Sequence, residues 1–175
     1  MKIYLAGPDV FRPNPVIFFN QIKDLGNELG FSIQTPLDPH HSDLKGLDLA
    51  KSIFLSNLDL IRNSDLVLAN CNSFRGPLID DGTAFEIGYA FSLKKKIIGY
   101  LKEKITLPVN VSRKLHCSLH SSGYLIDPDG FLVNEDFGNS INLMMEFAIM
   151  ESGGFLFEGN LEDCLREIQK IDLQK

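Results

Sequence analysis

Short apolar runs alternate with stretches of helical periodicity along most of the chain, and this alternation constrains the fold more than any other feature. Compact apolar runs, each with the length of a buried strand, occur at 3–6, 65–70, 96–101 and 155–157, and 31–35 alternates between apolar and polar residues as a strand does. Apolar residues at helical spacing fill the intervals, at about 14–29, 50–61, 83–93, 139–152 and 160–168. Strict alternation of strands and helices is typical of βαβ units. We therefore predict an α/β fold, a doubly wound, five-stranded parallel sheet flanked by helices.

The 175 residues fit a single domain, which we place at 1–175. The alternation breaks between 103 and 137, where Pro108, Gly123 and Gly130 punctuate a stretch with little periodicity. A connection of this length without structure is uncommon inside a domain and is often functional. We expect an irregular active-site loop or subunit contact there, not a linker to another domain.

Composition argues against several classes of partner. The net charge is −6, from 17 lysines and arginines against 23 acidic residues, and would repel a phosphate backbone, so we expect no nucleic-acid binding. No apolar run approaches the ~20 residues of a membrane helix, so we expect no membrane association. Cys71, Cys117 and Cys164 lie far apart and form no CxxC pair, which is typical of reduced thiols in a cytoplasmic protein.

Doubly wound sheets bind ligands beyond the carboxyl ends of their strands, at the point where the strand order reverses. We therefore expect the chemistry in the loops after the first, third and fourth strands. The sequence lacks the GxGxxG and GxxxxGK(S/T) motifs of nucleotide-binding loops and the GxSxG motif of hydrolases. No cofactor is indicated.

The segment 73–88 holds most of the candidate chemistry, because Asp80, Asp81 and Glu86 converge with Arg75 where a loop enters a helix. Gly82 and Gly88 would allow close approach to the backbone. Two interpretations of Glu86 are open. Thr83-Ala84-Phe85-Glu86 has the form of a capping box, which would fold Glu86 back onto the helix start. A carboxylate in a cleft at the strand ends could instead be a nucleophile or a general base.

Other polar residues admit both a structural and a functional role. Asn57 falls on the apolar stripe of its helix, so its amide either ties a loop in place or reaches a ligand. Tyr4 lies in the middle of the first strand and could be a core residue with a buried hydroxyl. Asn142 could be a capping residue. His40 and His41 are adjacent and have no spaced third ligand, so we predict no metal site.

Together these motifs resemble the nucleoside 2-deoxyribosyltransferases, from residue 2 to about residue 150. The resemblance is carried in family order by residues 2–8 with Phe11, then 57–65, 74–77, 80–88 and 141–144. It implies a flavodoxin-like fold and the transfer of 2-deoxyribose between nucleobases through a covalent deoxyribosyl-glutamate, without metal or diffusible cofactor. Deoxynucleosides and free nucleobases would be the partners.

The resemblance also assigns roles to single residues. Glu86 matches the nucleophile, Tyr4 the tyrosine that holds it, and Asp80 a carboxylate at the base that can share a proton with the leaving group. Asn142 matches an amide that reaches the 5′-hydroxyl from a neighbouring subunit, which implies a homo-oligomer with shared active sites. The substrate contacts implied by the motifs are Gly7, Phe11, Asn57, Gly82, Asn142 and Met144.

The chain departs from the family pattern at Asn57, where several relatives have aspartate. An amide cannot act as an acid, so Asp80 or solvent would have to supply the proton, and the choice between purine and pyrimidine bases stays open. For Arg75, pairing with Asp80, Asp81 or a partner subunit is open. The alternatives to a transferase are a hydrolase of 2′-deoxynucleoside 5′-monophosphates and a non-catalytic nucleotide-derivative binding domain. A serine-lined basic site would suit the phosphate, whereas Asn142 and Asp9 suit an uncharged 5′-hydroxyl.

Overall fold

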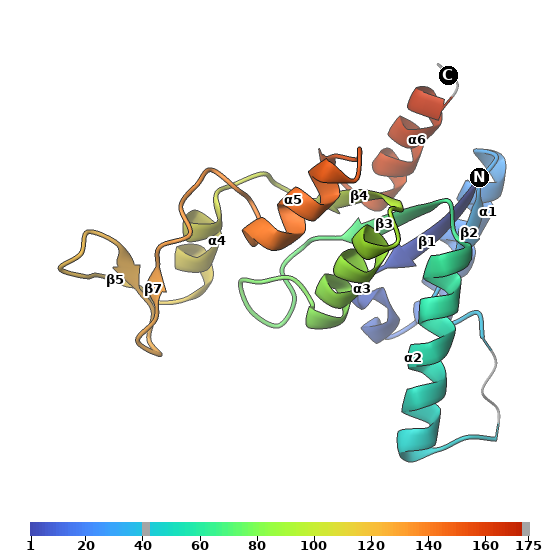
Figure 1. Cartoon of the computed structure of the whole chain (residues 1–175), viewed down its shortest axis with the longest axis horizontal. Helices are drawn as coiled ribbons and strands as arrows, with labels where there is room; N and C mark the ends of the chain where they lie inside the picture. The colour runs from blue at the N-terminus through green and yellow to red at the C-terminus, as the bar shows by residue number, and fades with distance from the viewer. Residues whose placement is uncertain (40–42, 173–175) are drawn as a thin grey trace.

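The computed structural model describes residues 1–39 and 43–172 and shows the predicted five-stranded parallel sheet (Figure 1). The strands lie in the order β2-β1-β3-β4-β8. Their bounds are β1 Lys2–Ala6, β2 Ser32–Gln34, β3 Leu66–Asn70, β4 Lys96–Leu101 and β8 Leu156–Glu158. The chain moves outward from β1 to β2 on one side and from β3 to β8 on the other, so the strand order reverses between β1 and β3.

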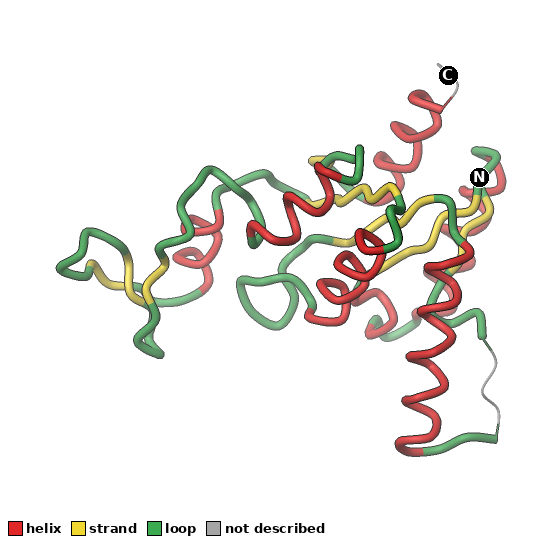
Figure 2. The backbone as a smooth tube through the Cα atoms, viewed as in Figure 1, coloured by secondary structure: helices red, strands yellow, loops and turns green. Residues whose placement is uncertain are grey.

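Helices cover both faces of the sheet (Figure 2). One layer is α1 Pro15–Glu28 with α6 Leu161–Asp172, and the other is α2 Gly46–Asn63, α3 Asp81–Ser92 and α5 Leu143–Glu151. Side chains alternate between the two layers along each strand. In β1, Ile3 and Leu5 pack toward α1 and α6, whereas Tyr4 and Ala6 pack toward α2, α3 and α5. This alternation aims the Tyr4 side chain at α3.

The segment 103–137 is more regular than we predicted. It contains the helix α4 Leu107–Lys114 and a small antiparallel sheet of β5 Ser118–Leu119, β6 Leu125–Ile126 and β7 Leu132–Val133. Each of these strands has 2 residues, which is too short for an alternating pattern to be recognised in the sequence. The small sheet projects from the main body (Figure 1).

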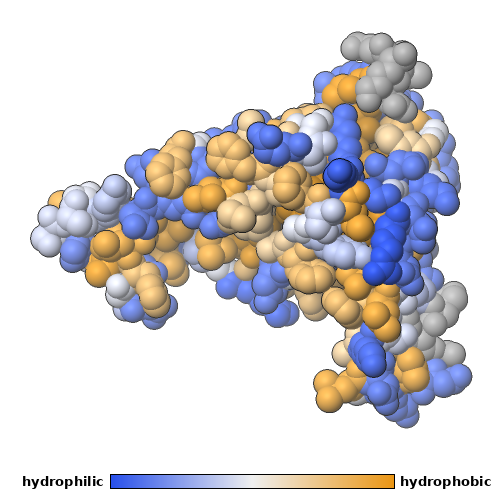
Figure 3. All heavy atoms as spheres, in the orientation of Figure 1, coloured by the Kyte–Doolittle hydropathy of each residue, from blue (hydrophilic) through white to orange (hydrophobic). Residues whose placement is uncertain are grey.

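The layer of α2, α3 and α5 leaves large apolar side chains uncovered. Apolar side chains gather over α3 and α5 and at the lower end of α2 (Figure 3). The exposed members are Leu47, Phe54, Leu55, Phe85, Phe91, Met144, Phe147 and Met150. Large exposed apolar areas often mark interaction sites. Within the described residues, no helix is both long enough and apolar enough to span a membrane.

Candidate active site

The centre of the candidate site is a hydrogen bond between two predicted site residues that lie 82 positions apart. The Tyr4 hydroxyl donates to Glu86 Oε1 at 2.6 Å. Tyr4 is fully buried in β1, and Glu86 lies in the second turn of α3, next to the buried residues Thr83 and Ile87. The helical period therefore turns Glu86 toward the sheet, where it meets the side chain that β1 presents on this face.

The surroundings of this pair control its protonation. Burial raises the pKa of Glu86 from 4.5 to about 7; the Tyr4 hydrogen bond opposes this rise and the charge of Asp80 adds to it. Burial also raises the pKa of Tyr4, and the neighbouring Glu86 raises it further, so the hydroxyl keeps its proton. The pair thus joins a permanent donor to a carboxyl group that changes charge near neutral pH.

Asp80 begins α3 as its N-cap. Its Oδ2 accepts hydrogen bonds from the Thr83 backbone N–H and the Thr83 hydroxyl, both at 2.9 Å. Of the two interpretations left open for Glu86, the capping box with Thr83 is therefore wrong. In a capping box the Glu86 side chain would accept from the backbone N–H of Thr83. Asp80, three positions before Thr83, accepts from that N–H, and Glu86 accepts from Tyr4 instead. A Cβ at Gly82 would lie 3.1 Å from Asp80 Oδ2, so a side chain there would crowd the cap.

A cavity of about 400 Å³ opens beside Glu86, within the range of small-molecule sites. It lies at the carboxyl edge of the sheet, between the loops that follow β1 and β2, the helix α2 and the start of α3. The described residues that line it are Gly7, Val10, Phe11, Pro36, Leu37, Ile53, Asn57, Asp80, Asp81, Gly82 and Glu86. Six predicted site residues are among them, Tyr4 lies behind Glu86, and no lysine or arginine belongs to this set.

The Asn57 side chain brings an unpaired oxygen to this cavity. Its Oδ1 is buried and has no hydrogen-bond partner among the described residues. Buried amide oxygens nearly always have a partner, so a structural bond does not explain this residue within the described chain, and a ligand N–H group would complete it. Gln34 Oε1, at the end of β2, is also buried without a partner among the described residues, and the sequence analysis did not single it out.

An aromatic stack joins two loops at the cavity. The Phe11 ring packs on Phe74 with centroids 5.4 Å apart and an interplanar angle of 19°. The Arg75 guanidinium lies 5.0 Å from the Phe11 ring centre and 4.7 Å from that of Phe74. Arg75 also has a positive φ of 51°, which is uncommon for a residue with a side chain. In the described structure Arg75 forms no ion pair with Asp80 or Asp81, and its partners are the two rings.

Asn142 and Met144 do not line the Glu86 cavity. Asn142 is the N-cap of α5, so the helix begins later than the expected start at Asn139 or Ser140. Its Oδ1 accepts from the Met144 N–H at 3.1 Å and its Nδ2 donates to Glu135 at 2.9 Å. Asn142 faces a second cavity, of about 360 Å³, while Met144 is 73% exposed. Asp81 lines both cavities, so they flank the start of α3.

Comparison with known proteins decides the family. A family model described as nucleoside 2-deoxyribosyltransferase matches residues 3–144. The chain belongs to the nucleoside 2-deoxyribosyltransferase family. The resemblance that the sequence motifs carried is thereby confirmed, and the chain is an enzyme of this type.

Individual relatives agree with this assignment. The chain is 30% identical over 168 residues to an uncharacterized protein of Schizosaccharomyces pombe, covering 88% of this chain and 79% of the other. A solved 2-desoxiribosyltransferase from Leishmania mexicana is similar in structure with a TM-score of 0.71 and 27% identity, over 97% of both chains. A conserved protein from Enterococcus faecalis shares the fold with a TM-score of 0.58 and 22% identity, over 97% of this chain and 98% of that one.

Other reactive groups of this deoxyribosyltransferase lie outside the Glu86 cavity. Burial raises the pKa of Cys71 to about 12 and that of Cys164 to about 12, so both thiols stay protonated. The described residues contain no cluster of His, Cys, Asp and Glu that could hold a metal ion. His40 and His41 lie outside the described residues.

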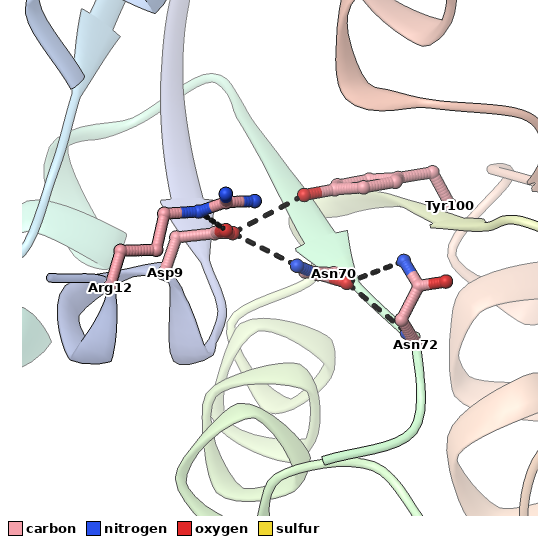
Figure 4. Close-up of polar contacts among 5 residues, drawn as sticks. All are labelled: Asp9, Arg12, Asn70, Asn72 and Tyr100. Carbon is pink, nitrogen blue, oxygen red and sulfur yellow. Dashed lines mark hydrogen bonds and ion pairs between the residues drawn. The ribbon is translucent and has the colours of Figure 1, made fainter. Parts of the chain in front are cut away.

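A polar cluster of this deoxyribosyltransferase lies beside the cavity and was not predicted from the sequence (Figure 4). Asp9, expected near the substrate, is buried and bonds Arg12 and Asn70. It is not among the described residues that line the Glu86 cavity. The only sequence signal was a polar residue, Asn70, at the end of an otherwise apolar strand.

Proposed function

We propose that this enzyme transfers 2-deoxyribose from one nucleobase to another by double displacement, with Glu86 as the nucleophile. The observation that carries the proposal is a carboxylate anchored by Tyr4 at 2.6 Å in the wall of a cavity of about 400 Å³. Retaining glycosyl transfer needs an anionic carboxylate beside the sugar carbon and a group that fixes its direction. Glu86 and Tyr4 have the chemistry for these two roles.

In the first step a Glu86 oxygen forms a bond to C1′ while the bond from C1′ to the base nitrogen breaks. The base leaves with the bonding electron pair and takes a proton from Asp80 or from solvent. In the second step a nitrogen of the incoming base attacks C1′ and gives up its proton to Asp80 or to solvent, while the bond to Glu86 breaks and restores the carboxylate. The scheme uses no metal and no diffusible cofactor.

The base would lie between Phe11 and Asn57. The Phe11 ring offers a stacking surface whose orientation Phe74 supports. Asn57 Oδ1 would accept a hydrogen bond from an N–H group of the base, which satisfies its unpaired oxygen. Gly7 and Gly82 would let the substrate approach the backbone on either side.

The 5′ end of the nucleoside would be held by a second copy of the chain. Asn142 and Met144 are absent from the described lining of the Glu86 cavity of their own chain, and Met144 is an exposed member of the apolar face of α2, α3 and α5. Pairing of this face between two copies would bury it and bring Asn142 and Met144 to the partner's cavity. We therefore propose a homo-oligomer with shared active sites.

The cavity favours deoxynucleosides over their 5′-monophosphates. No lysine or arginine is among the described residues that line it, whereas Asp80, Asp81 and Glu86 are. A dianionic phosphate needs cationic or dense hydrogen-bonding partners, and three carboxylates would repel it.

The test is to incubate the purified protein with deoxyinosine plus adenine, and separately with thymidine plus cytosine, and to separate the products by chromatography. We expect a new deoxynucleoside in at least one mixture, and the comparison assigns the base class. Glu86→Gln should lower the rate by at least about a thousandfold, because the amide cannot form the covalent intermediate. Full turnover by Glu86→Gln would exclude Glu86 as nucleophile. Free base without a new nucleoside would indicate a hydrolase, and preference for a monophosphate would contradict the proposed substrate class.

A further inference from the structure

A buried chain of hydrogen bonds joins three loops at the carboxyl edge of the sheet (Figure 4). Asn70 Nδ2 donates to Asp9 Oδ2 at 2.9 Å, and the Tyr100 hydroxyl lies 3.4 Å from the same oxygen. Asn70 Oδ1 accepts from the backbone and side-chain nitrogens of Asn72, at 3.1 and 2.8 Å. The bonds connect the loop after β1 to the ends of β3 and β4.

Both oxygens of the buried Asp9 carboxylate are engaged in this chain. Arg12 Nε donates to Oδ1 at 2.6 Å, while Asn70 takes Oδ2. A buried carboxylate that loses one of its donors becomes strongly destabilising. The two bonds therefore fix the orientation of the carboxylate and of the 3₁₀ helix Pro8–Phe11 that carries it.

The same asparagine also supports the loop through direct packing. A Cβ on Gly7 would lie 2.7 Å from the Cβ of Asn70, so the backbone of Gly7 rests on this side chain. The helix that follows Gly7 has no side-chain N-cap. Asn70 therefore supports the loop at two points: it packs against Gly7 and donates a hydrogen bond to Asp9.

We propose that Asn70 is a positioning residue for the reaction, which sets the loop carrying Gly7 and Phe11 against the substrate through its bond to Asp9. The inference rests on the proposed function, in which Gly7 and Phe11 border the substrate. An amide suits the position, because its nitrogen donates to the carboxylate while its oxygen accepts from both nitrogens of Asn72. Asn70 itself is not among the described residues that line the cavity.

The loss of this bond should affect binding more than chemistry. Asn70 and Tyr100 point to the α1 and α6 side of the sheet, whereas Tyr4 and Glu86 meet on the other side. A displaced loop would weaken contacts to the bound nucleoside and leave the nucleophile in place. The effect should therefore appear in KM, with kcat nearly unchanged.

The decisive variant is Asn70→Asp, which places a second carboxylate against Asp9. Above neutral pH the two charges repel, while in acid a shared proton restores a donor between them. Arg12 and Tyr100 contact Asp9 directly, and Cys71 and Cys164 are the further titratable groups that act on the Tyr100 hydroxyl. The last three have raised pKa values and stay neutral between pH 5 and pH 8, so the new carboxyl group alone adds a titration. Asn63→Asp, on the exposed end of α2, introduces the same charge change away from the site.

We expect the KM of Asn70→Asp for the deoxynucleoside to exceed that of the parent about tenfold at pH 8 and to approach it at pH 5, with kcat within about twofold. Asn63→Asp should match the parent throughout. The double variant Asp9→Asn/Asn70→Asp again has one donor and one acceptor between the two side chains. At pH 8 its KM should therefore fall most of the way back to that of the parent. Two outcomes would overturn the proposal. One is a KM of Asn70→Asp equal to that of the parent at every pH. The other is a fall in kcat as large as the rise in KM, without recovery in acid.

Amide hydrogen exchange of residues 7–12 provides a readout that does not need turnover. At pH 8 this segment should exchange faster in Asn70→Asp than in the parent, while α3 stays unchanged. If the parent transfers no deoxyribose, the proposed function fails, and the exchange data still test the role of Asn70. Unchanged exchange in the loop would then overturn the positioning role independently.

Discussion

At Glu86, the burial that shields the carboxylate also destabilises the folded protein. A carboxyl group whose pKa rises from 4.5 to about 7 binds protons more tightly when folded, so its contribution to stability falls as the pH rises through this window. Above pH 7 the penalty amounts to at most about 3 kcal/mol, and water in the cavity reduces it.

Glu86→Gln should remove this penalty, because a neutral amide still accepts the Tyr4 hydrogen bond. We expect its melting temperature to equal that of the parent near pH 4.5 and to exceed it by several degrees at pH 8. Thermal unfolding at the two pH values measures this, with the exposed Glu28→Gln as the matched control. A constant difference between parent and Glu86→Gln at both pH values would contradict the assigned pKa shift.

Tyr4 should set the pH at which the enzyme becomes active. In the parent, kcat/KM should rise with pH and level off above about 7, as Glu86 ionises. Tyr4→Phe deletes the hydrogen bond that lowers the pKa of Glu86, so the rise should move to higher pH and the plateau should fall by about ten- to a hundredfold. A profile that keeps its midpoint in Tyr4→Phe would show that the hydroxyl does not tune the carboxyl group.

At the scale of elements, the start of α3 combines a helix cap with a candidate proton donor. Asp80→Ala should destabilise the protein by about 1 kcal/mol through loss of the cap, and Asp80→Asn much less, because an amide oxygen can still accept from Thr83. Both variants should lose turnover to a similar degree if Asp80 shares a proton with the leaving base. Denaturant unfolding and steady-state kinetics separate the two effects. Full turnover in Asp80→Asn would show that Asp80 caps the helix and takes no part in proton transfer.

The elements themselves were predictable where each had a strong period. All five strands of the parallel sheet were found, because four contain a compact apolar run, β2 alternates between apolar and polar residues, and each lies next to a helical period. The start of α3 was placed too late, because Thr83 follows Asp80 and could cap equally well. The start of α5 was placed too early, because Asn139 and Ser140 precede Asn142, the alternative capping residue that the structure selects. The short strands β5 to β7 gave no usable pattern.

At the scale of the whole molecule, the separation of Asn142 from Glu86 leads to a mixing experiment. Glu86→Gln and Asn142→Ala should each be nearly inactive as pure proteins. In hybrid dimers one site receives an intact Glu86 and an intact Asn142, so an equal mixture should regain about a quarter of the parent activity. Activity after subunit exchange, with exchange verified by native mass spectrometry, measures this. No recovery despite verified exchange would place Asn142 in the site of its own chain or outside any site.

The cavity as a whole could be predicted only in part. The motifs named Glu86, Asp80 and Asn57, and the fold brings these three to one cavity. The supporting bond from Asn70 to Asp9 joins residues 61 positions apart, and no local spacing indicates such a pair. The stacking of Arg75 on two rings likewise depends on how two loops meet, which only the folded chain specifies.

The place of Tyr4 in the middle of β1, fully buried between β2 and β3, bears on how such an enzyme can change. The group proposed to orient the nucleophile belongs to the hydrophobic core, whereas the surfaces proposed to meet the base belong to a loop and to one helix. Mutations in the loop and the helix can alter which base is accepted while the core stays intact. Descendants of this chain can therefore diversify their substrates quickly and still inherit one unchanged chemical step.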